Sequence, residues 1–123
     1  MSESLRPEQR IRRRHSFQTI FDKGRFFRGV LLNLWVYEGL ENEEKRTGGK
    51  PKLGIIVSRK TDLKAVRRNL WKRRIREVFR RQQKDFKLPV AILIQSKKQP
   101  KMPSYQAIEQ EMKKLFEKAQ ILK

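Results

Sequence analysis

The sequence contains no cysteine, and its only histidine is His15. The absence of cysteine excludes disulfides, thiolate metal sites and thiol nucleophiles, and it fits a reducing cytosol. His15 lies in the run RRRHSF. A general base is conceivable there, but a surface histidine beside the start of a helix is the more common case.

Long apolar runs are also missing. The longest are VLLNLWVY at 30–37 and VAILI at 90–94, far short of the roughly 20 residues that cross a bilayer. The N-terminal residues contain no apolar run of the kind found in a signal peptide. We therefore expect a soluble, cytoplasmic protein with no membrane partner.

Acidic residues are scarce: 13 Asp and Glu oppose 32 Lys and Arg, which gives a net charge of +19. Such a field attracts polyanions, so nucleic acid is the expected partner. The basic charge is concentrated in residues 45–81, which hold fifteen basic and two acidic residues. A length of 123 residues predicts a single domain, 1–123, in which 1–14 form a basic N-terminal segment that can be flexible.

The few acids show no spacing typical of a nuclease site. Glu41, Glu43 and Glu44 crowd the Gly-containing segment 39–51, to which we assign no role. Glu77 lies among arginines, with which we expect it to form ion pairs. A self-contained two-metal nuclease needs several converging carboxylates, so no catalytic residue is expected in this chain.

Hydrophobic periodicity and turn residues predict an α+β fold, with a single, mainly antiparallel sheet packed against helices. Ser16 is expected to cap the first helix and Gly24 to end it, and Ser104 is expected to introduce the last helix. The element order is αβ(β)βαβα, where the strand in brackets is optional. The predicted helices span 16–24, 65–82 and 105–122, and the predicted strands span 30–37, 52–59 and 88–96.

The central helix, AVRRNLWKRRIREVFRRQ, combines a narrow apolar stripe with eight basic residues and a single acid. At 100° per residue, the stripe consists of Trp71, Ile75, Val78 and Phe79, which we expect to dock on the sheet. Leu70 lies off this stripe and is expected to be partly exposed.

Beside the stripe, one side of this helix carries a ridge of polar and basic residues. Like charges on successive turns repel one another, and an anionic ligand would relieve that repulsion. Asn69 adds a neutral group that can bond a ribose hydroxyl, a base edge or a phosphate. The ridge consists of Asn69, Lys72, Arg73, Arg76 and Arg80.

The same segment resembles the signature of the bacterial ribonuclease P protein subunit, A-x-x-R-N-x-x-K-R-x-x-R-E-x-F-R. The runs RIRRRHSFQTIFDKGR and LGIIVSRK are similar to other parts of that family, so the likeness covers nearly the whole chain. Leu70 departs from the pattern, because the family commonly has a basic residue there. The nine matching positions are Ala65, Arg68, Asn69, Lys72, Arg73, Arg76, Glu77, Phe79 and Arg80.

The resemblance implies a fold like the second domain of ribosomal protein S5, with a left-handed β-α-β crossover. It also implies that the protein binds the catalytic RNA of ribonuclease P, one protein per RNA, and that together they remove the 5′ leader of precursor tRNA. The protein would hold no cofactor stably, and the RNA partner would require Mg²⁺. The residues expected to contact the catalytic RNA are Arg67, Arg68, Asn69, Lys72, Arg73, Arg76 and Arg80.

The resemblance further implies that a cleft between the first helix and the sheet receives the leader as a single strand. Phe17 and Phe21 fit a core on pattern alone, and Trp35 fits either a core or a base-stacking surface. The residues assigned to this cleft are Arg12, Arg13, Arg14, Phe17, Phe21, Trp35, Arg59 and Lys60.

Two other functions compete with this hypothesis. One is an RNA-binding module like a ribosomal protein, without a role in tRNA processing; charge does not separate it from a ribonuclease P subunit, but the signature does. The other is a stand-alone nuclease, which predicts that the purified protein cleaves precursor tRNA without any RNA partner.

Overall fold

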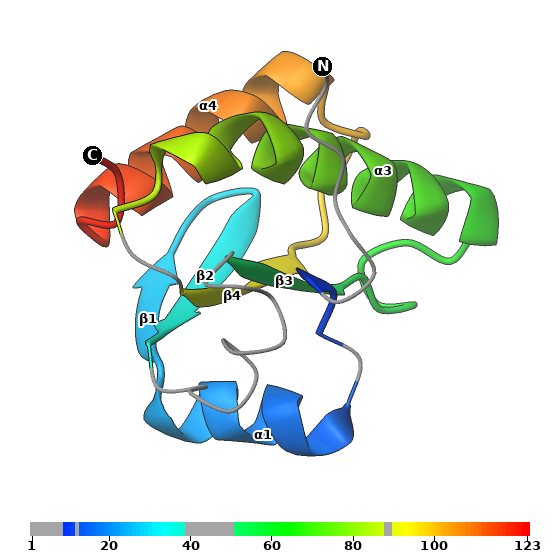
Figure 1. Ribbon diagram of the computed structural model, residues 1–123. Coiled ribbons are helices and arrows are strands. Elements are labelled where there is room, and N and C mark those ends of the chain that lie inside the picture. The colour runs from blue at the N-terminus through cyan, green and yellow to red at the C-terminus, as the bar shows by residue number, and fades with distance from the viewer. Residues whose placement is uncertain (1–8, 12, 39–50, 88–89) are drawn as a thin grey trace.

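The computed structural model describes residues 9–11, 13–38, 51–87 and 90–123. Helices α3 and α4 lie side by side on one face of a four-stranded sheet, and α1 covers the other face (Figure 1). The elements are α1 (Arg14–Lys23), β1 (Arg25–Arg28), β2 (Leu32–Tyr37), β3 (Lys52–Ile56), α3 (Ala65–Gln82), the 3₁₀ helix η2 (Gln83–Asp85), β4 (Ala91–Ser96) and α4 (Tyr105–Lys118).

The strand order in the sheet is β1-β2-β4-β3. The pairs β1/β2 and β2/β4 are antiparallel, whereas β3 and β4 are parallel neighbours connected through α3. The predicted α+β class and mainly antiparallel sheet are confirmed. Three strands precede α3, as the bracketed order allows, but no strand was predicted at the position of β1. The left hand of the β-α-β crossover stays a prediction.

The two faces of the sheet explain the apolar patterns of the central strands. In β4, Ile92 and Ile94 pack in the core under α3 and α4, while Ala91 and Leu93 pack in a second core under α1. Because both faces are covered, β4 is a continuous apolar run. In β2 the residues alternate, so Trp35 points to the α1 side.

The start of the first helix was predicted incorrectly. Helix α1 begins at Arg14 with Arg13 in the capping position, and Ser16 is buried within the helix, 4% exposed, instead of capping it. Ser16 and Ile20 are the buried residues of this helix, and Arg13 makes no side-chain capping hydrogen bond. Gly24 ends the helix, as predicted.

Other boundaries agree in part. The helix predicted over 65–82 is confirmed at both ends, and Ser104 Oγ accepts a hydrogen bond from Ala107 N at 3.1 Å. β2 begins at residue 32 instead of 30, and β3 ends at residue 56 instead of 59. The last helix ends at residue 118 instead of 122 because Leu122 forms a β-bridge with Phe86.

The N-terminal residues 9–11 run parallel to β3 and extend the sheet at its edge. Arg10 forms a parallel bridge with Leu53, and Ile11 N donates to Leu53 O at 2.9 Å. Gln9 is fully buried, and its Nε2 donates to Pro51 O at 2.9 Å and to Gln83 Oε1 at 2.8 Å. This segment therefore joins the edge of the sheet to the end of α3.

The turn between β1 and β2 is held by a carboxylate from α4. Glu111 accepts hydrogen bonds from the backbone N–H groups of Val30, Leu31 and Leu32 at 3.0, 2.7 and 2.6 Å. A Cβ on Gly29 would lie 2.8 Å from Glu111 Oε2 and 2.4 Å from Leu32 O, so this close approach requires glycine. One side chain thus fixes the turn of the β1–β2 hairpin.

We expect Glu111→Gln to lower the free energy of unfolding by about 1 to 3 kcal/mol, because charge-assisted bonds to the turn are lost. Urea unfolding would measure this change. The control is Glu117→Gln, which changes an exposed carboxylate on the same helix and should leave stability within about 0.5 kcal/mol. Equal stability of the two variants would contradict the role assigned to Glu111.

Candidate nucleic-acid interface

The central helix is anchored by the stripe that its sequence predicts. Trp71, Ile75, Val78 and Phe79 are buried, with exposed fractions of 2% or less. The Phe79 ring packs edge-on against Phe86, at 5.8 Å between centroids. Leu70 is partly buried, as expected. The anchor fixes which side of α3 faces solvent.

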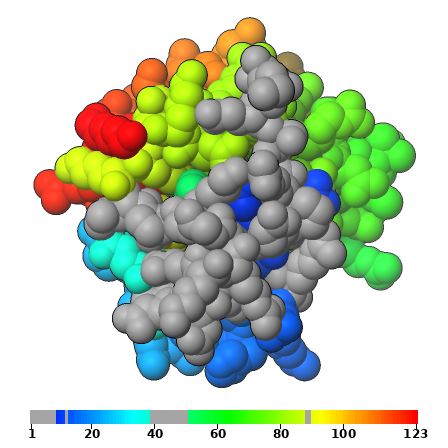
Figure 2. Space-filling model, viewed as in Figure 1, coloured from blue at the N-terminus to red at the C-terminus, as the bar shows by residue number. Residues whose placement is uncertain are grey.

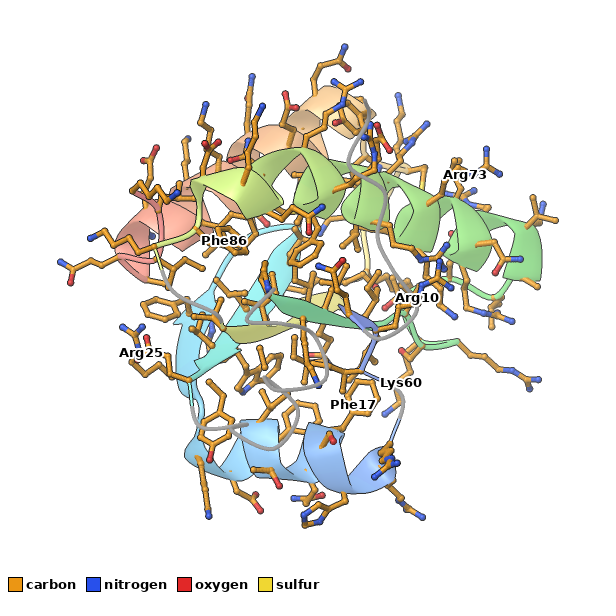
Figure 3. The ribbon with its side chains drawn as sticks, in the orientation of Figure 1. Arg10, Phe17, Arg25, Lys60, Arg73 and Phe86 are labelled. Atoms are coloured by element: carbon orange, nitrogen blue, oxygen red, sulfur yellow. The ribbon has the colours of Figure 1, made fainter. Side chains whose placement is uncertain are left out.

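The ridge on α3 reaches the surface most fully at Asn69 and Arg73. Both side chains are exposed, and neither makes a hydrogen bond or an ion pair with the described residues. Arg73 projects from the outer side of α3 in Figure 3, and the N-terminal part of this helix protrudes at the right of the space-filling view (Figure 2). The other ridge residues, Lys72, Arg76 and Arg80, are partly buried.

Glu77 and Arg80 form the best-defined ion pair on α3. Arg80 Nε and Nη2 donate to the two carboxylate oxygens of Glu77 at 3.0 and 2.6 Å, and Arg81 Nε donates to Oε1 at 3.2 Å. The hydrogen bond from Arg80 is the main reason that the pKa of Glu77 lies below its usual value. The predicted pairing of Glu77 with arginines is confirmed, and Arg80 is the ridge cation with an acidic partner on its own helix.

Arg76 has a second cation beside it instead of an acid. Partial burial, and then the charge of Arg10, lower the pKa of Arg76. Arg76 and Gln83 are seven residues apart, so they share a side of α3, and Gln9 bonds to Gln83. The N-terminal segment therefore brings Arg10 toward the ridge (Figure 3). The sequence does not reveal this proximity because it depends on a long-range strand pairing.

Arg67 and Arg68 bind their own loop. Arg67 Nε lies 2.6 Å from Asp62 Oδ2, and Arg68 Nη1 donates to the carbonyl oxygens of Asp62 and Leu63 at 3.0 and 2.8 Å. Asp62 Oδ1 also accepts from Lys64 N at 3.2 Å. These contacts fix the loop before α3 to the first turn of the helix. Both arginines therefore stabilise the fold, in addition to the RNA contact predicted for them.

The remaining arginines of α3 face α4. Arg74 donates a hydrogen bond to Pro103 O, and the Arg81 guanidinium lies 5.8 Å from the centroid of the Tyr105 ring. The basic residues of α3 therefore divide between contacts within the protein and a solvent-facing ridge.

An aromatic patch lies on the α1 side of the sheet. We define it as Phe17, Phe21, Phe26 and Trp35. The Trp35 centroid is 4.8 Å from that of Phe21, edge-on, and 4.8 Å from that of Phe26, tilted at 46°. Phe17 lies between α1 and the sheet (Figure 3), where its Cε1 would be 3.0 Å from a Cβ on Gly54. The structure thus brings together the three aromatic residues predicted for the leader cleft.

These three residues are also core residues. Phe17, Phe21 and Trp35 are partly buried and pack against the second core, so the core role is confirmed and the base-stacking role stays a prediction. Phe26, the fourth residue of the patch, is 45% exposed. It was not identified from the sequence. Its four-residue strand, RFFR, is too short to show an alternating pattern.

The basic residues predicted around the aromatic patch meet at one end of the sheet. Residues 9–11 run parallel to β3, so the chain leaves both segments at the same end of the sheet. Arg13 and Arg14 follow residues 9–11, and Arg59 and Lys60 follow β3. All four are exposed. Arg12 lies outside the described residues.

Other kinds of site find less support. The described part of the chain contains no group of three or more His, Cys, Asp or Glu that could hold a metal ion, and His15 is exposed. No helix within the described ranges is long and apolar enough to span a membrane. Of the segment to which no role was assigned, 39–50 lie outside the described residues.

A pocket of about 600 Å³ lies at the C-terminal ends of α3 and α4, away from the ridge and the aromatic patch. Its charges are mixed in sign. The lining residues are Gln82, Asp85, Lys87, Lys113, Glu117, Gln120, Leu122 and Lys123.

Comparison with known proteins gives a consistent result. The family model described as Ribonuclease P matches residues 5–120. The ribonuclease P protein component of a Pseudanabaena species is 30% identical over 115 residues, which is 94% of each chain. That of a Picosynechococcus species is 32% identical over 117 residues, which is 95% of each chain.

Solved structures share the fold. The RNase P protein of Staphylococcus aureus matches with a TM-score of 0.79 and 24% identity, over 94% of this chain and 98% of that chain. The RNase P protein of Thermotoga maritima matches with a TM-score of 0.71 and 25% identity, over 89% of this chain and 96% of that chain.

Proposed function

Because the chain belongs to the ribonuclease P protein family, we propose that it binds the catalytic RNA of ribonuclease P and the 5′ leader of precursor tRNA. In this role it assists the RNA in removing the leader. One protein would act with one catalytic RNA, in the cytoplasm.

The ridge on α3 is the observation that carries this proposal. Asn69 and Arg73 are exposed on a helix whose opposite side is fixed in the core. Because the helix backbone is already fixed, binding does not have to order it, and cations on it that meet phosphates release counterions from the RNA. The proximity of Arg10 and Arg76, without an acid paired to either in the described residues, also favours an anionic partner.

The aromatic patch supports a single-stranded partner for the second surface. Bases stack on aromatic rings whatever their identity, and nearby arginines and lysines neutralise the backbone. The patch and its basic rim therefore fit a leader of variable sequence. Contacts to phosphate from Arg13, Arg14, Arg59 and Lys60 would position the strand without reading it.

We assign the bond-breaking chemistry to the catalytic RNA. Magnesium ions held by that RNA would activate the attacking water. The residues of this chain would raise the affinity for substrate and reduce the repulsion between two RNA molecules, because they present cations to both.

Reconstitution tests this assignment. The purified protein with Mg²⁺ should leave precursor tRNA intact, and addition of the catalytic RNA should give cleavage at the end of the leader. At low salt, the protein should increase the rate over that of the RNA alone. Cleavage by the protein alone would support a stand-alone nuclease, and RNA binding without any effect on cleavage would support a generic RNA-binding module.

Trp35→Ala should reduce the preference of the reconstituted enzyme for leader-bearing over mature tRNA by about fivefold, because one stacking surface is lost. The measurement is the dissociation constant of the reconstituted enzyme for leader-bearing tRNA and for mature tRNA. Trp35→Phe, which keeps an aromatic ring, should retain most of the preference. An equal loss of affinity for both tRNAs would contradict a leader-specific role.

A further inference from the structure

The β1–β2 hairpin presents four side chains on the α1 side of the sheet, and three of them lie beyond the predicted cleft. In the antiparallel register, Phe26 pairs with Trp35 and Arg28 pairs with Asn33. Residues two apart in a strand share a face, so all four point to the side on which Trp35 meets Phe21. We call these residues, Phe26, Arg28, Asn33 and Trp35, the hairpin site.

The first observation is the exposure of Phe26. Its ring is 45% exposed although it lies 4.8 Å from the Trp35 ring. Single exposed apolar residues are common, but this one continues a row of aromatic rings from α1 across β2 to the edge strand. The row therefore ends on a ring that has room for one more planar group.

The second observation is an unsatisfied polar atom beside that ring. Within the described residues, Asn33 Oδ1 is buried and has no hydrogen-bond partner, which is unfavourable for a polar atom. The residue as a whole is only partly buried, so rotation about its Cβ–Cγ bond can turn the amide toward a ligand. A donor on the edge of a base would satisfy this oxygen.

The third observation is charge. Arg28 is exposed, stands opposite Asn33 and forms no ion pair with the described residues. Its guanidinium is available to a phosphate. By contrast, Arg25 on the same strand binds Ala119 O at 3.1 Å and Glu38 at 3.5 Å.

An exposed aromatic ring, an amide oxygen without a partner and a cation without an ion pair among the described residues match the base, the base edge and the phosphate of one nucleotide. We propose that the hairpin site binds a nucleotide of single-stranded RNA, with its base on Phe26, its edge on Asn33 and its phosphate on Arg28. This inference rests on the proposed function, because it takes the RNA to be the leader. It extends the path of the leader from α1 to the edge strand β1.

The test uses the enzyme reconstituted with the catalytic RNA and precursor tRNAs whose leaders are lengthened one nucleotide at a time. With the wild-type protein, affinity should rise at the step that reaches the hairpin site. Phe26→Ala should remove that gain, about fivefold, and leave the affinity for shorter leaders unchanged. An abasic nucleotide at the same step should weaken the wild-type protein equally and should have no further effect on Phe26→Ala.

Two more variants separate binding from folding. Phe26→Leu keeps an apolar side chain but should lose most of the gain, and Asn33→Ala should lose about threefold, only when the base is present. Val30→Ala changes a residue that is 74% exposed in the turn of the same hairpin, and it should bind like the wild type. Thermal melting would show that all variants fold.

A loss that is the same for every leader length, or no loss with Phe26→Ala, would overturn the hairpin site. If Trp35→Ala still reduces leader preference in that case, the proposed function stands and only the extension fails. If Trp35→Ala also has no leader-specific effect, the leader contact itself is wrong.

Discussion

Arg73→Glu should weaken the complex with the catalytic RNA by about tenfold to a hundredfold at moderate salt. The substitution removes a cation that faces phosphate and puts an anion in its place, and a like-charge contact can cost several kcal/mol. A loss of 1.4 kcal/mol is already tenfold. Because Arg73 is exposed and pairs with no described residue, the fold should be unaffected.

The salt dependence gives a second, independent measure. If Arg73 neutralises one phosphate, the slope of the logarithm of affinity against the logarithm of salt concentration should fall by about one. The matched control is Lys114→Glu, which makes the same charge change at an exposed position on α4. The control should reduce affinity much less. Equal losses in the two variants would show that only net charge matters, and the ridge would not be the interface.

Charge reversal at Arg68 should also weaken the complex with the catalytic RNA, but two effects would contribute to the loss. Its guanidinium holds the carbonyl oxygens of Asp62 and Leu63, so Arg68→Glu disturbs the start of α3 as well as the charge. Arg73 is the cleaner probe. This difference between two arginines of one signature appears only once the loop before α3 has been placed against the helix.

Local pattern predicts much of this fold because the deciding interactions lie within one element. The helix 65–82 follows from its buried stripe, and the start of α4 follows from Ser104. Where distant segments decide, the pattern fails. Leu122 leaves the helical pattern because it pairs with the distant residue Phe86. The strand β1 was missed for another reason, because its four residues are too few to show an alternating pattern.

The same distinction applies to the site. The exposure of Asn69 and Arg73 follows from helical geometry, so the sequence predicts it. The approach of Arg10 to Arg76 requires the pairing of residues 9–11 with β3, and the unsatisfied oxygen of Asn33 depends on its neighbours in the sheet. Neither property is encoded in the spacing of nearby residues.

Phe79→Ala should lower the free energy of unfolding by about 3 to 5 kcal/mol. Phe79 has no exposed surface, and its ring contacts Phe86, which in turn packs edge-on against Phe116 of α4 at 5.1 Å. The cavity would lie where α3, the residues after η2 and α4 meet (Figure 3). Small domains have only about 5 to 15 kcal/mol of stability, and a charge of +19 repels itself, so much of the variant should be unfolded.

Urea unfolding followed by the fluorescence of buried Trp71 would measure the effect. Val66→Ala is the matched control, since Val66 lies on the same helix and is 80% exposed; its stability should stay within about 0.5 kcal/mol of the wild type. Phe79→Leu should fall between the two and remain folded. Once corrected for the folded fraction, its RNA affinity should equal that of the wild type, because the ridge is unchanged. Arg73→Glu should do the reverse, losing affinity at unchanged stability. If fully folded Phe79→Leu instead bound RNA more weakly than the wild type, the position of the ridge would depend on the detailed packing around Phe79, and not only on the anchoring of α3.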